Sequence, residues 1–258
     1  MRDFIATGWR PILDANDLKG FEEIWALDIG WFEVPNERRG GWSGVSRCDL
    51  ELPEGGSSGV FVKRQQDHVF RSLRHPVRGM LTFAREFTNL QRYRSRGIPT
   101  LEPLYFALRR VEGHRRAILV TRELSGYVPL DHWLESRDAT DLHRRRELVA
   151  RVAAVAAQLH RHHLQHNCFY PKHVFIGELD GRVDVRIIDL EKTKWRLSKA
   201  RASLRDLDTL NRHSPHWSRT DRLRFLLAYY GRDRVDARVR GTWQRLAARM
   251  RNKQRRSA

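Results

Sequence analysis

The sequence predicts an α+β protein in which a strand-rich first lobe precedes a mainly helical second lobe. Up to about residue 125, segments rich in Val, Phe and Trp alternate with glycine-containing reversals, which is typical of strands. After that point a long stretch carries apolar residues at helical spacing. We therefore expect residues 1–124 to form the first lobe and residues 125–258 the second, joined near residues 123–130.

The composition is that of a folded protein of 258 residues, enough for one large domain or two tightly joined lobes. Hydrophobic residues make up 40% of the chain, which excludes wholesale disorder. No apolar run approaches the ~20 residues of a membrane-spanning helix, and the N-terminal MRDFIATGWR lacks the apolar core of a signal peptide. Two cysteines, Cys48 and Cys168, fit a reducing compartment, so we expect a cytoplasmic protein.

The charge is strongly basic: 49 Lys and Arg against 31 Asp and Glu leave a formal net charge of +18. Such a field attracts nucleic acid, the anionic inner leaflet of a membrane, or a phosphorylated glycolipid. Arginine, which dominates here, donates two hydrogen bonds at once to a phosphate. The alternative interpretation is an ordinary soluble surface with a basic bias, and the charge alone does not distinguish it from a binding surface.

Extended segments account for most of the expected first lobe. WFEVPN, WSGVSRCDLEL and VFVKRQ, between residues 31 and 65, have strand composition and are separated by glycine-rich turns. YFALRR and RRAILVTREL predict a hairpin that reverses across residues 112–114. The first lobe is thus expected to be strands with one inserted helix.

That helix is expected within HPVRGMLTFAREFTNLQRYRSRGIPT, residues 75–100. Phe83, Phe87 and Leu90 fall on one face, and a Gly and a Pro near the end of the segment would stop the helix. Glu86 is expected near its middle, on or close to the side opposite Phe83 and Leu90.

The second lobe is expected to begin with a long helix in DLHRRRELVARVAAVAAQLHRHHL, residues 141–164, which has Leu148, Val152, Val155 and Leu159 at helical spacing. Two short strands, HVFIGEL and RVDVRIID, should follow, because Asp-Gly is a favoured tight turn. Helices are expected to the end of the chain.

The last of these helices is expected in RVDARVRGTWQRLAARMRNKQRR, residues 234–256. Its apolar face carries Val239, Trp243, Leu246 and Met250. This helix would either lie on an anionic membrane surface or pack on the second lobe with a solvated basic side.

Lys63 and Glu86 come in the order that a nucleotide phosphate site requires. A lysine at the end of a strand can contact phosphate when a glutamate on the next helix orients it. Taken singly, each is better explained as a surface charge. Gly40, Gly41 and Gly44 lie between the first two strands, where their backbone could cover a nucleotide or merely form a hairpin turn.

The loop HNCFYPKHVFIGELDGRVDVRIIDLEK, residues 166–192, has the layout of a phosphotransferase active site. In the kinase pattern a loop Asp precedes a metal-binding Asn by five positions, and a second metal-binding Asp follows a hairpin. Cys168 and His173 have that offset, and Asp189 follows the hairpin at the end of an apolar run. A buried Asp is costly unless something binds it, although a helix cap or an ion pair is an alternative role for Asp189.

Two neighbouring groups leave alternatives open. The histidines from His160 to His166 suggest a metal site, but without a matching Cys or Asp set they are better read as surface or loop-packing side chains. Arg205 and Asp206, in SLRDLDTL, either support the loop from a helix or form a plain surface pair.

Six motifs in order, FVKRQ, TFAREFTNL, AILVTREL, HNCFYPKHVFI, IIDLEK and LRDLDTL, carry a family resemblance. Over about residues 30–230 the sequence resembles the lipopolysaccharide kinase (Kdo/WaaP) family, specifically its InaA-like branch. The resemblance implies a protein-kinase-like bilobal fold, the cofactors ATP and Mg²⁺, and transfer of phosphate to a sugar hydroxyl of the lipopolysaccharide inner core.

The resemblance also implies roles for single residues of the first lobe. Lys63 and Glu86 would be the phosphate-holding pair, and Gly40, Gly41 and Gly44 would belong to the nucleotide-covering turn. Glu123 and Leu124 would form the hinge beside adenine.

In the second lobe, Asp189 would bind the metal, and His173 would take the position of a metal-binding Asn. The departure from the pattern is Cys168, preceded by His166, where active family members have an Asp as loop base. Cys168, His166 and Asp189 are therefore the candidate catalytic side chains. A second departure is Glu191, which replaces the Gly that follows the metal-binding Asp in protein kinases.

Three classes of function compete: an active kinase for a sugar or glycolipid acceptor, a pseudokinase that binds nucleotide or an anionic partner without turnover, and a nucleic-acid-binding protein. Nucleic acid is not expected as a partner, because the sequence has no recognised binding module. General-base assistance is worth ~10²–10⁴ in rate, so loss of the Asp need not abolish transfer. We predict a slow or specialised kinase whose partner is the lipopolysaccharide core or another anionic glycolipid, with peripheral contact at the inner face of the inner membrane as a further expectation.

Overall fold

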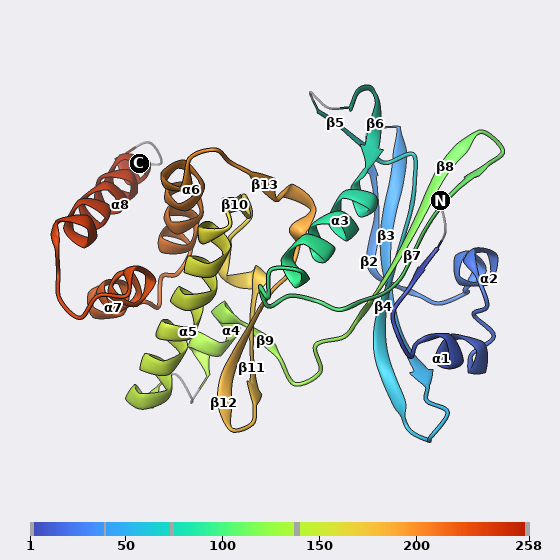
Figure 1. The fold of residues 1–258 in the computed structure, drawn as a ribbon, viewed down its shortest axis with the longest axis horizontal. Coiled ribbons are helices and arrows are strands. Elements are labelled where there is room, and N and C mark those ends of the chain that lie inside the picture. Colours follow the sequence, from blue (N-terminus) through green and yellow to red (C-terminus); the bar gives the residue numbers. More distant parts are fainter. Residues whose placement is uncertain (1–2, 39, 73–74, 137–139, 256–258) are drawn as a thin grey trace. The chain divides into compact units, whose positions relative to one another are not determined.

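The computed structural model describes residues 3–38, 40–72, 75–136 and 140–255 (Figure 1). Contacts within the chain divide it into two compact units. The first unit comprises Met1–Arg92 and Leu101–Ser125, and the second comprises Tyr93–Thr100 and Gly126–Ala258. Each unit is described separately below.

The first unit is built on a six-stranded antiparallel sheet with the order β1-β7-β8-β4-β3-β2. Its strands are β1 (Phe4–Ile5), β2 (Trp31–Arg38), β3 (Gly41–Glu51), β4 (Ser57–Gln66), β7 (Pro103–Val111) and β8 (His114–Arg122). The three extended segments and the hairpin expected from the sequence are therefore confirmed. Lys63 was expected at the end of its strand, but it lies three residues inside β4, where neighbouring strands pair on both sides.

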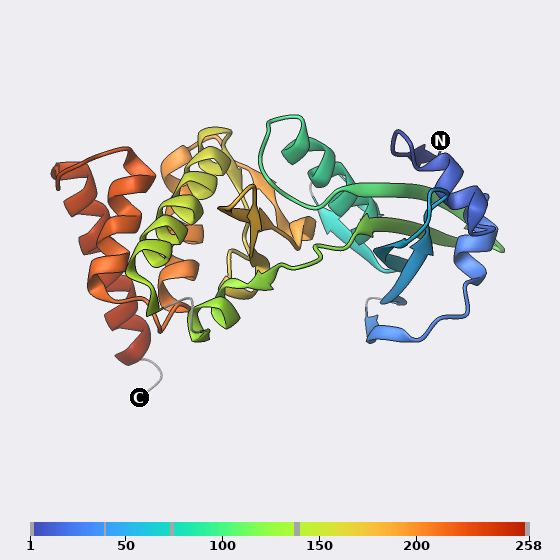
Figure 2. The same ribbon diagram turned by 90° about the horizontal axis from the view of Figure 1, so that it is seen from below.

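Two short helices, α1 (Arg10–Ala15) and α2 (Phe21–Ala26), were not predicted. Both are only six residues long, too short for a helical period to stand out in the sequence. They cover one face of the sheet and complete its core, and α3 (Thr82–Arg94) lies on the other face (Figures 1 and 2). The core on the α1–α2 face joins Trp9, Leu13, Phe21 and Ile24 to Val60, Val62, Ile118 and Val120.

The helix expected over residues 75–100 is shorter than predicted. Residues His75–Leu81 form the strand β6, which pairs with β5 (Val69–Ser72), and α3 begins only at Thr82 and ends at Arg94. Gly79 has a φ of +59°, which an α-helix does not accommodate. The predicted face of Glu86 was also wrong: Glu86 lies only about 60° from Phe83 and about 40° from Leu90 around the helix, so all three share one buried face.

The second unit contains the long predicted helix as α5 (Leu142–Arg161). Asp141 accepts hydrogen bonds from the backbone N–H groups of His143 and Arg144 and so caps it. The apolar face of α5, including Leu148, Val152 and Leu159, is fully buried. The other helices are α4 (Leu130–Glu135), α6 (Lys199–Arg212), α7 (Arg219–Tyr230) and α8 (Ala237–Arg255).

The predicted hairpin of the second unit is β11 (Val174–Leu179) and β12 (Arg182–Ile187). Its two turn residues, Asp180 and Gly181, both have positive φ, as a tight hairpin turn of matching twist requires. The short strand β9 (Val128–Pro129) extends this sheet, and β10 (Leu164–Gln165) pairs with β13 (Lys194–Trp195).

Helix α8 resolves one alternative left by the sequence. Val239 and Leu246 are buried, and α8 contacts α6 and α7, so its apolar face belongs to the core of the second unit. The helix is therefore packed on the second unit, with Trp243 and Met250 of the same face half-buried. Arg256, the last residue of the predicted segment, lies outside the described residues. Among the helices that the structure describes, none has the length and apolar character to cross a bilayer.

Candidate functional site

The first unit holds a buried ion pair between Lys63 of β4 and Glu86 of α3. The ammonium of Lys63 donates a hydrogen bond of 2.6 Å to Oε1 of Glu86. The Glu86 side chain is 4% exposed and that of Lys63 17%, so water screens the pair weakly. Lys63 points away from Val62 and Ile118 because side chains alternate along a strand, and this brings it to the α3 face. The structure thus brings together the two predicted residues and leaves a fixed cation.

The three candidate glycines each have a structural reason of their own. Gly40 has a φ of +77° at the turn between β2 and β3. A Cβ on Gly41 would lie 2.1 Å from the carbonyl oxygen of Gln66, and one on Gly44 would lie 2.4 Å from the ring of Trp31. Close packing therefore accounts for Gly41 and Gly44, and a role in covering nucleotide stays a prediction.

Glu123 and Leu124 follow directly after β8. The backbone N–H of Glu123 donates to the carbonyl of Gly59, and its carboxylate accepts two hydrogen bonds from Arg47, of 2.7 and 3.0 Å. Leu124 is half-buried. The carboxylate is thus used within the sheet, and the role of these residues beside adenine stays a prediction.

In the second unit a buried carboxylate, Asp206 of α6, anchors the start of the candidate loop. It is fully buried and accepts hydrogen bonds from the backbone N–H groups of His166, at 2.6 Å, and Asn167, at 2.9 Å. The Nε2 atom of His160 lies 3.2 Å from the same carboxylate. Of the two alternatives for the Arg205–Asp206 pair, loop support therefore holds for Asp206, whereas Arg205 is exposed.

The sequence carried a signal for this anchor. Asp206 is four residues after Ala202 and four before Leu210, and both of these are buried, so Asp206 belongs to the apolar face of α6. A charged side chain on an apolar face needs partners, and here they are mainly backbone donors.

His166 connects the loop to the segment that leads to Asp189. Its Nδ1 accepts a hydrogen bond from the backbone N–H of Cys168, so its Nε2 carries the proton and donates to the carbonyl of Ile188, at 2.9 Å. Burial lowers the pKa of His166 despite the nearby carboxylates of Asp206 and Asp189, so the ring is neutral at pH 7. Both ring nitrogens are engaged inside the loop, which suits a positioning role; the predicted catalytic role is not tested by this geometry.

Cys168 is 6% exposed and lies in the loop position that the sequence assigned to a base. Burial raises the pKa of its thiol more than the neighbouring ammonium of Lys192 lowers it. The thiol is therefore protonated at neutral pH, and it is a weak proton acceptor.

Asp189 and His173 lie side by side. His173 Nδ1 is 2.8 Å from the carbonyl oxygen of Cys168 and 3.5 Å from Oδ2 of Asp189. Asp189 was expected at the end of a buried strand, but β12 ends at Ile187, and the Asp189 side chain is 33% exposed, so the argument from burial does not apply.

Backbone conformation marks this region more clearly than burial does. Asp189 is left-handed, with φ 58° and ψ 60°. Asn167 and His163 also have positive φ, as does Asp180 at the hairpin turn, so four of the seven such non-glycine residues in the described chain lie in or beside residues 166–192. Residues in this conformation are held by their surroundings and cluster at functional sites.

The donor set can be compared with the requirements of Mg²⁺. Mg²⁺ prefers oxygen ligands and is commonly held by one or two carboxylates together with substrate phosphates. The half-exposed carboxylate of Asp189 fits that role. The Nδ1 of His173 is engaged by the carbonyl oxygen of Cys168, which leaves Nε2 as the ring nitrogen for a metal, and the metal-binding role of His173 stays a prediction. Within the described residues no group of three or more His, Cys, Asp and Glu is arranged to hold a metal by itself. The histidines of this region pack instead: His160 contacts Tyr229 and Asp206, and His163 bonds to the carbonyl of Arg196.

The arrangement of strands and helices matches a solved kinase structure. The structure described as "WaaP in complex with acyl carrier protein" superposes with a TM-score of 0.69, covers 98% of both chains and is 22% identical. This match establishes the fold and confirms the expected α+β, protein-kinase-like architecture.

Sequence comparison identifies the family. The sequence model of the lipopolysaccharide kinase (Kdo/WaaP) family matches residues 22–229, and the chain therefore belongs to that family. The Protein InaA of Escherichia coli (strain K12) is 28% identical over 195 residues, which cover 75% of this chain and 87% of InaA. The resemblance to the InaA-like branch seen in the motifs is thus confirmed.

Proposed function

We propose that this chain transfers a phosphoryl group from ATP to a sugar hydroxyl of the lipopolysaccharide inner core. Membership of the lipopolysaccharide kinase family supports the class of reaction and of acceptor. The observation that carries the proposal for this chain is the buried Lys63–Glu86 ion pair. A lysine fixed in this way is suited to contacting nucleotide phosphates, because the glutamate holds its ammonium in one position.

Each cluster has its own role in the proposed reaction. Lys63, oriented by Glu86, binds phosphate oxygens and offsets their charge. Asp189 holds Mg²⁺, which when bound offsets charge on the transferred group. His166 and Asp206 keep the loop in place by backbone hydrogen bonds, so that Cys168 and Asp189 keep a fixed geometry.

The least favourable part of this site is the group that would accept the proton of the acceptor hydroxyl. The thiol of Cys168 is protonated at neutral pH and accepts a proton poorly. The transition state of phosphoryl transfer is loose, so positioning and charge supply most of the rate and a weak base is tolerated. We therefore expect slow transfer. A pseudokinase with the same fold is the alternative.

The experiment is calorimetric binding of Mg²⁺-ATP, followed by single-turnover transfer from labelled ATP to inner-core lipopolysaccharide. Asp189→Ala should remove the Mg²⁺-dependent part of binding and should also remove transfer. Glu178→Gln is the matched control, because Glu178 is an exposed acid on the neighbouring hairpin. If Asp189→Ala binds Mg²⁺-ATP as the wild type does, the metal assignment is wrong.

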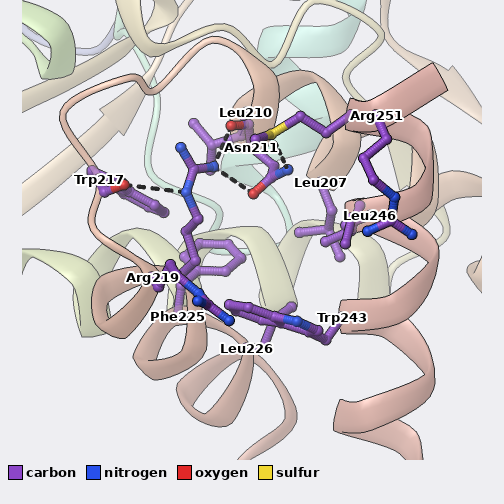
Figure 3. A pocket seen from close by; sticks show the side chains of 13 residues that line it. Leu207, Leu210, Asn211, Trp217, Arg219, Phe225, Leu226, Trp243, Leu246 and Arg251 are labelled. Carbon is purple, nitrogen blue, oxygen red and sulfur yellow. Dashed lines mark hydrogen bonds between the residues drawn. The ribbon is translucent and has the colours of Figure 1, made fainter. Parts of the chain in front are cut away.

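A cavity in the second unit favours an additional partner. It has a volume of about 300 Å³ and lies among side chains of α6, α7 and α8 (Figure 3). Its lining is mostly apolar and includes Leu207, Leu210, Phe225, Leu226, Trp243 and Leu246. Trp217 also lines it, and among the described residues the buried Nε1 of Trp217 has no hydrogen-bond partner.

The solved WaaP structure holds an acyl carrier protein, and we propose that a protein of this kind binds here with its acyl chain in the cavity. Arg219 and Arg251 line the cavity and would attract an acidic carrier. Filling the cavity with Ala247→Phe should weaken binding of acylated carrier protein. Ala228→Phe, at an exposed position of α7, should not. Equal affinity of wild type and Ala247→Phe would exclude the cavity as the binding site.

A further inference from the structure

The segment from Thr193 to Ser198, which contains β13 and leads into α6, exposes two large apolar side chains. Trp195 is 55% exposed and Leu197 is 86% exposed. Single exposed apolar residues are common on protein surfaces. Here, however, the two alternate with Lys194 and Arg196 along an extended segment, so Trp195 and Leu197 are directed to the same side of it.

The backbone of this segment is held firmly, so the exposure of Trp195 and Leu197 does not come from a loose end. The backbone N–H of Arg196 donates to the carbonyl of His163 at 2.8 Å, and His163 Nδ1 lies 3.0 Å from the carbonyl oxygen of Arg196. Trp195 pairs with Leu164 in the β10–β13 ladder, and its ring stacks on that of His163.

Both ends of the segment are anchored as well. Thr193 is buried, and its hydroxyl lies 3.1 Å from that of Tyr93. Ser198 caps α6 by accepting a hydrogen bond from the backbone N–H of Arg201. The two apolar side chains are therefore presented to solvent in a fixed conformation.

The charge around them has one sign. Between residues 192 and 205 the sequence contains six Lys and Arg and no Asp or Glu. Five of these cations, Lys192, Lys194, Lys199, Arg201 and Arg205, are exposed, and Arg196 is half-buried. We call the surface formed by Trp195, Leu197 and the exposed cations that follow them, Lys199, Arg201 and Arg205, the Trp195 surface.

We propose that the Trp195 surface docks this chain on an anionic phospholipid bilayer. Indole rings favour the headgroup region, leucine gains from burial below it, and each nearby cation is attracted to an anionic leaflet. A soluble phosphate ligand would use the cations and leave Leu197 without a role. A single-stranded nucleic acid would stack on Trp195 but would not bury an aliphatic side chain. The proposal concerns a surface and does not depend on phosphoryl transfer.

The first test removes the apolar part of the surface. The full chain is sedimented with vesicles of phosphatidylglycerol and phosphatidylcholine, without nucleotide. Trp195→Ala/Leu197→Ala should weaken binding at least about tenfold, because both side chains would enter the interface. The matched control, Leu142→Ala/Leu179→Ala, removes two exposed leucines elsewhere in the same unit and should bind as the wild type does. Equal binding by the wild type and the Trp195/Leu197 variant would overturn the proposal.

The second test removes charge. Lys199→Gln/Arg201→Gln/Arg205→Gln should weaken binding by about a hundredfold, at roughly fivefold per cation near the surface. Arg182→Gln/Arg234→Gln/Arg240→Gln changes the net charge equally at exposed positions of the same unit, and should have a much smaller effect.

Equal losses of vesicle binding in the two triple variants would show that binding follows net charge alone and would reject this surface. The proposal would also be rejected if the wild type bound pure phosphatidylcholine vesicles as tightly as the anionic ones, or if it bound no vesicles at all. Loss of single-stranded oligonucleotide binding in the Trp195/Leu197 variant, with vesicle binding unchanged, would favour nucleic acid instead.

Discussion

The two candidate clusters hold their key carboxylates in different ways. In the first unit Glu86 accepts a hydrogen bond from a side chain, Lys63, across a strand–helix contact. In the second unit Asp206 accepts from two backbone N–H groups of the loop, 39 and 40 residues earlier in the chain. The first arrangement fixes one cation, and the second fixes the course of a whole loop.

The clusters differ also in what they still contain. The first has both members of its charged pair, whereas the second has a neutral thiol, Cys168, at the position predicted for the base. A side-chain pair is lost when either partner changes. A loop held by backbone donors can keep its shape while the side chains it presents change.

The largest effect is expected from restoring the carboxylate. Cys168→Asp should raise phosphate transfer to inner-core lipopolysaccharide by up to about 10²–10⁴-fold, the usual contribution of a general base. The ammonium of Lys192 beside residue 168 would stabilise the new charge. Single-turnover transfer from labelled ATP is the measurement, and Cys168→Ala is the control, expected to cost little because the thiol is protonated.

Two outcomes would change the comparison. If wild type and both Cys168 variants bind ATP but transfer nothing, the chain is a pseudokinase and the loop has lost more than its base. If Cys168→Ala abolishes a measurable activity, the thiol participates directly in transfer.

Next in size is the effect of removing the buried anchor. Asp206→Asn should lower the free energy of unfolding by about 3–5 kcal/mol, because buried backbone donors lose a charged acceptor. Denaturant unfolding measures this loss. Asp233→Asn, at an exposed position, should change stability by less than about 0.5 kcal/mol. A loss for Asp206→Asn as small as that of the control would mean that the loop does not depend on this anchor.

The ion pair should behave differently, because both partners can be removed together. Lys63→Met should cost about 2–3 kcal/mol of unfolding free energy, since it leaves the carboxylate of Glu86 buried without its cation. Lys63→Met/Glu86→Leu should recover most of this loss, because the unpaired charge is gone. If the losses of unfolding free energy were additive in the double variant, Lys63 and Glu86 would not stabilise each other as a pair. Both variants should bind Mg²⁺-ATP weakly.

The smallest effect concerns pH. Burial lowers the pKa of His166 in the folded protein, so below the unfolded value of about 6.5 the unfolded chain binds a proton that the folded one does not. His166 therefore contributes stability above about pH 6.5, and that contribution falls by up to about 1.4 kcal/mol per pH unit towards pH 5. Unfolding of wild type at pH 7 and 5.5 measures this fall. His166→Gln should reduce the dependence on pH, and the exposed His143→Gln should leave it unchanged.

Local pattern in the sequence determined much of this protein. The spacing of Leu148, Val152 and Leu159 determined α5, and Asp180–Gly181 determined the β11–β12 turn, because both patterns act over neighbouring residues. The order of motifs from Lys63 to Asp189 was enough to indicate the family to which the chain belongs. The identity of residue 168, on which the question of activity depends, is also known from the sequence alone.

Tertiary structure decided what depends on distant partners. Residues 75–81 became the strand β6, and not the predicted helix, because β5 offers a pairing edge and Gly79 adopts positive φ. The apolar face of α8 is covered by α6 and α7, which no property of that segment by itself could show. Asp206 anchors the loop because folding brings α6 against residues 166 and 167. In each case the local sequence was compatible with two structures. Contacts with residues far away in the chain decided between them, because burial and hydrogen bonding depend on the surrounding fold.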